Sequence, residues 1–196
     1  MFQVRIHGRG GQGVVTAAEL LSVAAFCDGH VAQAFPSFGS ERTGAPVVAF
    51  CRIDAGRIRT REPIVAPDGI IVLDATLLHQ VDLFSGVRSD GYVVLNSSRS
   101  LEELGLSEMV DQHARARLIT VPATELALAH TGRPVPNAVL LGGFAALTGV
   151  VSLDSVVTAI RERFTGAVAE GNAAAATEAH GLVARRGEVD AGAPAA

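Results

Sequence analysis

The chain has 196 residues, the size of one ordinary domain, and 48% of them are hydrophobic against 18% charged. The net charge is −4, and the 16 basic residues, all arginine, give no positive excess of the kind that binds nucleic acid. The longest apolar stretch, residues 138–151, is broken by glycines and shorter than the roughly 18–20 residues of a membrane helix. We therefore expect no nucleic acid and no membrane as partner. Since the first residues resemble a strand and not a signal peptide, we expect a cytoplasmic location.

The first third of the chain predicts strands around one helix. Residues 2–7 alternate apolar and polar side chains, and residues 13–27 carry an apolar stripe at helical spacing. An Asp-Ala-Gly turn at 54–56 indicates a hairpin leading into another strand at 57–61. The elements expected here are a strand at 2–7, a helix at 13–27, a strand at 30–35, a loop at 36–45, and strands at 46–53 and 57–61.

The rest of the chain alternates apolar strands with helices and then becomes wholly helical. The expected strands are 70–73, 92–95 and 118–121, and the expected helices are 77–84, 106–116, 123–130, 137–149, 154–164 and 169–186. This order predicts an α/β fold with a Rossmann-like open, mostly parallel sheet, flanking helices and a helical C-terminal layer. We expect a single domain over residues 1–186 and a flexible tail over 187–196.

A glycine-rich turn joins the first strand to the first helix. Gly8, Gly10 and Gly13 satisfy the spacing GxGxxG, and glycines there allow close approach of an anion to the free N–H groups of the helix. A dinucleotide site also expects an acidic residue at the end of the second strand, where this chain has only Gln33-Ala34-Phe35-Pro36. The pattern therefore favours tight packing against a partner or an anion over NAD or FAD binding.

Two further segments, and the single residue Asp74, each have both a functional and a structural interpretation. The loop at 35–44 combines two phenylalanines with hydroxyls and a Glu-Arg pair, so it is either a solvated loop or an interface or ligand loop. Asn137 is either a plain N-cap or a site residue at the start of a glycine-containing helix, whose glycines suggest close approach of another backbone. Asp74 is a functional carboxylate or the cap of the following helix, and His7 is interpreted as structural.

The ligands for a metal or redox centre are missing from the sequence. Cys27 and Cys51 are the only cysteines, whereas a cluster or a structural zinc takes about four ligands. The six histidines are far apart in sequence, and no nucleophile with its base is visible. We expect no catalytic and no metal-binding residue in this chain.

Three segments together, residues 6–15 with the helix after them, residues 35–50 and residues 137–149, resemble the gamma subunit or gamma domain of the 2-oxoacid:ferredoxin oxidoreductases. The apolar strand ending in Asp74 fits the same pattern, and the likeness to these pyruvate:ferredoxin oxidoreductase-like proteins spans about residues 2–175.

The resemblance implies a subunit that is not catalytic alone. Partners would be an alpha, a beta and a ferredoxin-like delta subunit, which oxidatively decarboxylate a 2-oxoacid, usually to acyl-CoA, with thiamine diphosphate, Mg and 4Fe-4S clusters. Electrons would pass to ferredoxin or another acceptor. This chain would assemble the complex and shape its coenzyme A side, with Arg42 as the phosphate partner. The residues implied are Gly8, Gly10, Gly11 and Gly13 as a backbone cradle, Ser37, Ser40, Glu41, Arg42 and Thr43 as a loop, and Asn137.

Two other hypotheses stay open on the sequence alone. The chain could be a stand-alone Rossmann-type nucleotide-binding oxidoreductase, as GxGxxG by itself suggests, or a non-catalytic scaffold of another complex. A mean hydropathy of +0.34 and the small-residue helix at 137–149 also predict apolar faces meant for partners, so that the lone chain would self-associate.

Overall fold

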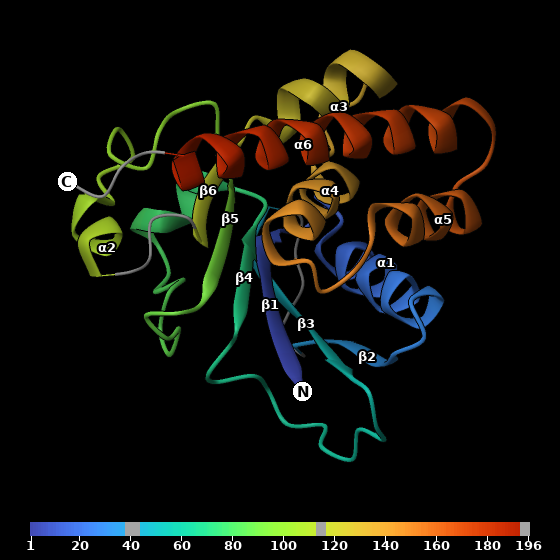
Figure 1. The fold of residues 1–196 in the computed structure, drawn as a ribbon, viewed down its shortest axis with the longest axis horizontal. Helices are drawn as coiled ribbons and strands as arrows, with labels where there is room; N and C mark the ends of the chain where they lie inside the picture. The colour runs from blue at the N-terminus through green and yellow to red at the C-terminus, as the bar shows by residue number, and fades with distance from the viewer. Residues whose placement is uncertain (38–43, 113–116, 193–196) are drawn as a thin grey trace.

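The protein forms a six-stranded sheet with a thick helical layer on one face (Figure 1). The computed structural model describes residues 1–37, 44–112 and 117–192, without the side chains of 187–192. The strands lie in the order β2-β3-β1-β4-β5-β6. Their bounds are β1 Phe2–Arg9, β2 Val31–Pro36, β3 Pro46–Asp54, β4 Gly69–Val72, β5 Tyr92–Asn96 and β6 Leu118–Val121.

The pairing of the strands confirms the predicted α/β fold class with a mostly parallel sheet. Strands β1, β4, β5 and β6 run parallel, whereas β3 is antiparallel to both β1 and β2. Residues 57–61 form no strand, so the predicted hairpin is wrong. The physical reason is that β3 lies between β2 and β1, which leaves no free edge on which a hairpin partner could pair.

Helices cover the sheet unequally. The bounds are α1 Val14–Cys27, η1 Ala75–His79, α2 Ser107–Gln112, α3 Ala123–Thr131, α4 Asn137–Thr148, α5 Leu153–Arg163 and α6 Gly166–Gly192. The predicted helix at 77–84 is wrong, because only a short 3-10 helix forms there. Instead of a continuous helix, this segment makes three-residue turns: the N–H of Gln80 donates to the carbonyl of Leu77 at 2.9 Å, and the N–H of Val87 donates to the carbonyl of Phe84 at 3.0 Å. The buried guanidinium of Arg5 holds the second turn by donating to the carbonyls of Leu83 and Ser85 at 2.9 and 2.7 Å. Helix α6 extends six residues beyond the expected end at Arg186, and the division into a domain and a tail stays a prediction.

The main hydrophobic core lies between the sheet and the helical layer. Helix α4 is buried from Asn137 to Ala145 and contacts α1, α5 and α6 (Figure 1). A Cβ on Gly142 would lie 2.0 Å from the carbonyl oxygen of Ala176 in α6, so the glycine permits the close backbone approach that the sequence suggests. This approach occurs within the chain. The small-residue helix is therefore not an exposed face for a partner, which corrects that part of the expectation.

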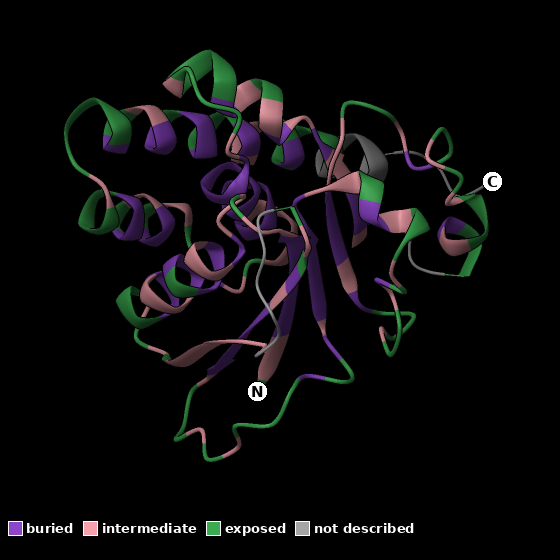
Figure 2. Cartoon of the chain, turned by 180° about the vertical axis from the view of Figure 1, so that it is seen from behind, coloured by how far each residue is buried: buried purple, intermediate pink, exposed green. Residues whose placement is uncertain are grey.

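The opposite face of the sheet is covered by η1, α2 and the loops around them. Apolar residues of β4, β5 and β6 form a second, smaller core there with Leu77, Leu83 and Leu101. Figure 2 shows the strands mostly buried and the loop between β3 and β4 mostly exposed. None of the helices in the described ranges is both long and apolar enough to cross a membrane.

Candidate functional site

The candidate site lies where the chain leaves β1 and β4, the two adjacent parallel strands at the centre of the sheet. From β1 the chain passes to β2 and β3 on one side, and β5 and β6 lie on the other side. Open α/β sheets bind ligands outside the carboxyl ends of such strands, at the point where the strand order reverses. The glycine turn after β1 and Asp74 after β4 both lie at this edge.

The glycines of the turn have different physical roles. Gly11 and Gly13 adopt φ of 95° and 78°, a backbone conformation that favours glycine. A Cβ on Gly8 would lie 2.6 Å from Cγ2 of Val14, so this position allows α1 to pack against the end of β1. The N–H of Gly10 donates to the carbonyl of Ala45 at 2.9 Å, which ties the turn to the segment before β3.

A polar network fills the crevice between the ends of β1 and β4. Oδ2 of Asp74 accepts from Nε2 of Gln12 at 2.8 Å and from Nε of Arg9 at 3.1 Å, while Oδ1 accepts from the N–H of Thr76 at 2.9 Å. Partial burial raises the pKa of Asp74, but the hydrogen bonds from Thr76 and Gln12 and the charge of Arg9 lower it below its ordinary value overall. Asp74 is therefore an ionised cap of η1, as the structural interpretation predicts.

The side chain of Gln12 lies beside the glycine turn and is bound there by Asp74. The backbone N–H of Arg9 also donates to Oε1 of Gln12 at 2.8 Å, so both ends of the Gln12 amide are engaged. Strand β2 ends in Phe35 and Pro36, without the acidic residue that would hold a ribose. The stand-alone nucleotide-binding hypothesis is not favoured.

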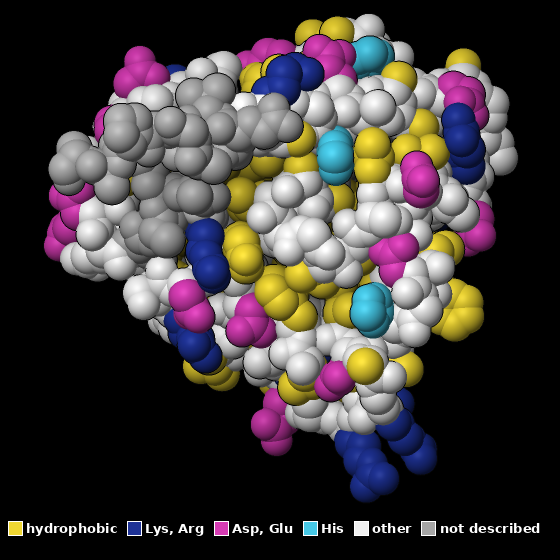
Figure 3. All heavy atoms as spheres, viewed as in Figure 1, with side chains coloured by type: hydrophobic (Ala, Val, Ile, Leu, Met, Phe, Trp, Pro, Cys, Tyr) yellow, Lys and Arg dark blue, Asp and Glu magenta, His cyan; other side chains and the backbone are white. Residues whose placement is uncertain are grey.

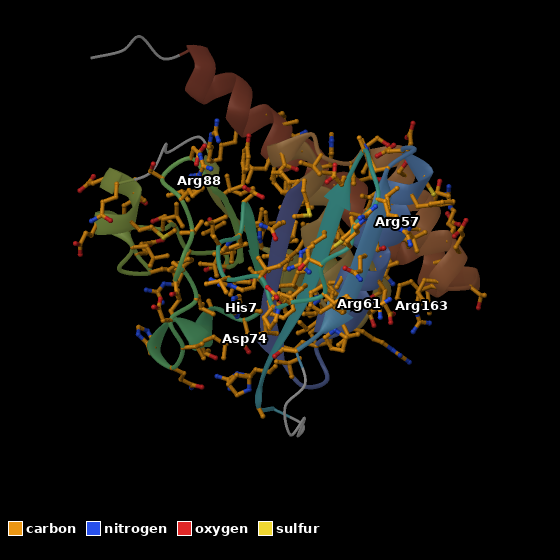
Figure 4. The ribbon with its side chains drawn as sticks, turned by 90° about the horizontal axis from the view of Figure 1, so that it is seen from below. His7, Arg57, Arg61, Asp74, Arg88 and Arg163 are labelled. Carbon is orange, nitrogen blue, oxygen red and sulfur yellow. The ribbon has the colours of Figure 1, made fainter. Side chains whose placement is uncertain are left out.

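The first turn of α1 lies between two cavities. Gly13 is the N-cap and provides no side-chain cap, so the first N–H groups of the helix keep their partial positive charge for an outside acceptor. One cavity, of about 280 Å³, is lined by the glycine turn, Thr16 and Val47. The other, of about 220 Å³, is lined by Gly11, Gly13 and Thr16 together with Arg133 and Arg163. In Figure 4, Arg163 lies well away from Asp74.

Asn137 brings the start of α4 to the start of α1. Its Nδ2 donates to the carbonyl of Gly13 at 3.4 Å, its Oδ1 accepts from the N–H of Ala138 at 2.8 Å, and the residue is 4% exposed. The predicted N-cap role is wrong, since Pro136 is the N-cap and Asn137 the first helical residue. A Cβ on Gly13 would lie 2.4 Å from Nδ2 of Asn137, so the two residues are in direct contact at the wall of the 220 Å³ cavity.

The predicted loop after β2 is described at its two ends. The N–H of Ser37 donates to the carbonyl of Val48 at 2.9 Å, and the N–H of Gly44 donates to the carbonyl of Gly10 at 3.2 Å. The second end of the loop is thus tied to the glycine turn, and Asn137 contacts the same turn at Gly13, so the three segments of the predicted site meet at the glycine turn. Ser40, Glu41, Arg42 and Thr43 lie outside the described residues.

Sequence reasoning missed the two arginines of the smaller cavity. Arg133 and Arg163 lie in segments that carry no motif, and only the tertiary fold brings them to the start of α1. Arg133 precedes the Pro-Val-Pro-Asn segment by one residue, which is the only sequence signal that could have pointed to it.

The buried pair of Arg5 and His7 is structural, as interpreted for His7. Nε of Arg5 donates to Nε2 of His7 at 3.0 Å, and both residues are under 10% exposed. Burial, and then the charge of Arg5, lower the pKa of His7 to about 4, so the imidazole is neutral. Among the described residues, no three His, Cys, Asp or Glu side chains are grouped to hold a metal ion.

Comparisons with known proteins identify the family. The family model "Pyruvate ferredoxin/flavodoxin oxidoreductase" matches residues 3–182. The pyruvate synthase subunit PorC of Methanothermobacter thermautotrophicus is 49% identical over 92% of this chain and 94% of its own. The pyruvate/ketoisovalerate oxidoreductases common subunit gamma of Pyrococcus abyssi is 48% identical over 91% and 95%.

Solved structures agree with these matches. The pyruvate oxidoreductase subunit PORC of Thermotoga maritima superposes with a TM-score of 0.77 at 32% identity, covering 92% of this chain and 95% of that one. A 2-oxoglutarate:ferredoxin oxidoreductase chain of Magnetococcus marinus, solved with coenzyme A and succinyl-CoA bound, has a TM-score of 0.70 over 94% of this chain and 31% of its own. Its identity is 15%, a likeness of fold alone. The chain therefore belongs to the pyruvate ferredoxin/flavodoxin oxidoreductase family, as a gamma subunit of a 2-oxoacid:ferredoxin oxidoreductase complex.

Proposed function

We propose that this subunit helps to assemble the complex and contributes a phosphate-binding face to the coenzyme A side of its active site. The observation that carries the proposal is the first turn of α1, which is open to two cavities and faces Arg133 and Arg163 in one of them. A helix N-terminus attracts anions, and a guanidinium binds phosphate through paired N–H groups. The Arg side chains and the helix therefore offer positive charge at one place.

The size of the cavities supports a site that is completed by another subunit. Pockets for whole ligands usually measure about 300–1,000 Å³. The two cavities beside α1 measure about 220 and 280 Å³ and lie on either side of the same helical turn. Each has room for a phosphate group or a short ligand segment, and the rest of a coenzyme A molecule would need walls from a partner.

The residues proposed for this face are those that the family resemblance implies, extended by the two arginines. The glycine turn would offer backbone N–H groups, and Asn137 would orient the start of α1 through its contact with Gly13. Within the predicted loop, Arg42 would be the phosphate partner. The full proposed set is Gly8, Gly10, Gly11, Gly13, Ser37, Ser40, Glu41, Arg42, Thr43, Arg133, Asn137 and Arg163.

The chemistry would be carried by the other subunits. We expect alpha, beta and ferredoxin-like delta subunits that hold thiamine diphosphate with Mg and the 4Fe-4S clusters, and ferredoxin or another carrier that accepts the electrons. When bound, thiamine diphosphate supplies the decarboxylation chemistry. This chain would bind and orient the phosphates of coenzyme A so that the acyl group can be transferred to its thiol.

Kinetics of the assembled complex test the proposal. Arg133→Gln with Arg163→Gln should raise the KM for coenzyme A by about ten- to a hundredfold, since a charge-assisted hydrogen bond contributes about 1.5–3 kcal/mol. The KM for the 2-oxoacid should stay unchanged. Arg185→Gln, at an exposed position of α6, is the matched control. An unchanged KM for coenzyme A in the double variant would refute the proposal and favour a purely structural subunit.

A further inference from the structure

A long loop between β3 and β4 projects from the edge of the sheet opposite the candidate site. It spans residues 55–68 and forms no helix or strand. In Figure 1 it is the lowest part of the chain, and in Figure 3 basic side chains project at this end of the molecule. Strand β1, which separates the two edges, has eight residues and so measures about 26 Å. The loop is therefore remote from the glycine turn.

Side chains of the sheet hold this loop in place through its backbone. Nη2 of Arg52 donates to the carbonyl of Glu62 at 2.5 Å, and Nη1 of Arg5 donates to the carbonyl of Val65 at 3.4 Å. The backbone N–H of Gln3 donates to Oδ2 of Asp68 at 2.8 Å. Arg5 and Arg52 are 8% and 2% exposed, so two buried arginines are used to fix a segment that itself has no regular structure. These contacts fix the second half of the loop, residues 62–68, which directly follows the arginines at 57, 59 and 61.

The outer side of the loop carries unpaired positive charge. Arg57, Arg59 and Arg61 are exposed, and none makes an ion pair or a hydrogen bond with a described residue. Figure 4 shows Arg57 and Arg61 on one side of the molecule, apart from His7, Asp74 and Arg88. The chain as a whole has a net charge of −4, so this basic loop contrasts with the rest of the protein.

An exposed apolar side chain accompanies these charges. Val65 is 77% exposed, although its own carbonyl is bound by Arg5 and the preceding residue, Ile64, is 3% exposed. The loop thus turns Ile64 inward and Val65 outward and carries three exposed arginines, and arginine and apolar anchors are both enriched in protein interfaces.

We propose that the β3–β4 loop docks on an acidic surface of another subunit of the oxidoreductase complex. The loop also carries two acidic residues, Glu62, which is exposed, and Asp68, whose Oδ2 is bound by the N–H of Gln3. The partner is assigned by charge complementarity, because the three guanidinium groups outnumber these carboxylates and attract a surface that supplies more of them. The proposal rests on membership of a multi-subunit complex and is independent of the phosphate-binding face proposed above, which lies at the other edge of the sheet.

Charge reversal in the assembled complex tests this docking. The full chain is co-expressed with its partner subunits as wild type, as Arg57→Glu with Arg61→Glu, and as Arg185→Glu with Arg186→Glu. The last pair lies at exposed positions of α6 and changes the net charge by the same amount. Native mass spectrometry then measures the ratio of assembled to free chain as the salt concentration is raised.

The loop variant should lower the ratio of assembled to free chain about tenfold at about 0.1 M salt, while the control pair stays within about twofold of wild type. Because salt screens charges over about 10 Å at 0.1 M and about 3 Å at 1 M, the difference should shrink as salt rises. Arg57→Gln with Arg61→Gln should give an intermediate loss, and the melting temperatures of the free variants should match wild type. An assembled fraction equal to wild type at low salt would overturn the proposal. So would an unchanged assembly with a raised KM for the electron carrier, which would assign the arginines to that protein.

Discussion

Substituting Gly142 by alanine tests whether α4 and α6 pack through direct backbone contact. The added Cβ would lie 2.0 Å from the carbonyl oxygen and 2.6 Å from the carbonyl carbon of Ala176. Ordinary van der Waals contact needs about 3.4 Å, so the two helices would have to separate by roughly 1.4 Å. Helix α4 also contacts α1 and α5, and it is buried from Asn137 to Ala145, so it cannot move away freely.

The expected loss of stability follows from two opposing effects. Overpacking a well-packed core typically costs 1–3 kcal/mol and occasionally more, and a backbone-to-backbone clash lies at the upper end of that range. Replacing a glycine inside a helix by alanine stabilises the helix by about 1 kcal/mol, because alanine has the higher helix propensity. We therefore expect Gly142→Ala to lower the free energy of unfolding by about 2 kcal/mol, which corresponds to a melting temperature about 4–8 °C lower for a chain of this size.

Thermal and urea unfolding of the full chain, followed by circular dichroism, measure the effect. Gly181→Ala in α6 is the matched control, because its Cβ would meet only Nη1 of the flexible Arg185 at 3.3 Å. The control should gain about 0.5–1 kcal/mol in stability from helix propensity. If Gly142→Ala melts at or above the temperature of wild type, the helices are not in backbone contact and the packing argument fails.

Two further predictions concern groups away from the candidate site. The pKa of His7 is about 4 in the folded chain and about 6.5 in the unfolded chain. The neutral imidazole therefore contributes fully to the free energy of unfolding above pH 6.5, and this contribution is lost as the pH falls to 4. Between about pH 7.5 and 5, wild type should lose about 2 kcal/mol more stability than His7→Gln in urea unfolding, and parallel pH profiles would contradict this. Asp28 accepts from the N–H of Ser152 at 2.6 Å and from Oγ of Ser155 at 2.7 Å, joining α1 to α5. Asp28→Ala should lower the free energy of unfolding by about 1–2 kcal/mol, against less than about 0.5 kcal/mol for the exposed Glu19→Ala. Equal melting temperatures for the two variants would refute a stabilising role for this contact between α1 and α5.

The sequence by itself determined the secondary structure wherever a local period is strong. The alternation of residues 2–7 places Val4 and Ile6 on the core face of β1 and Arg5 and His7 on the other, and the apolar run before Asp74 is buried on both faces of β4. The same local patterns carried the resemblance to the family. These patterns predict strands and helices correctly because a side-chain period of 2 or 3.6 residues depends only on residues that are neighbours in the sequence.

Only the tertiary structure decided which segments meet. Asn137 and Gly13 are 124 positions apart and touch, and Arg133 and Arg163 come to the same helix end without any motif. A hairpin at 57–61 fitted the turn signal, but both edges of β3 were already paired. Whether a crevice is open, a glycine faces a partner or an arginine is paired depends on contacts between segments far apart in the chain. No local period encodes those contacts.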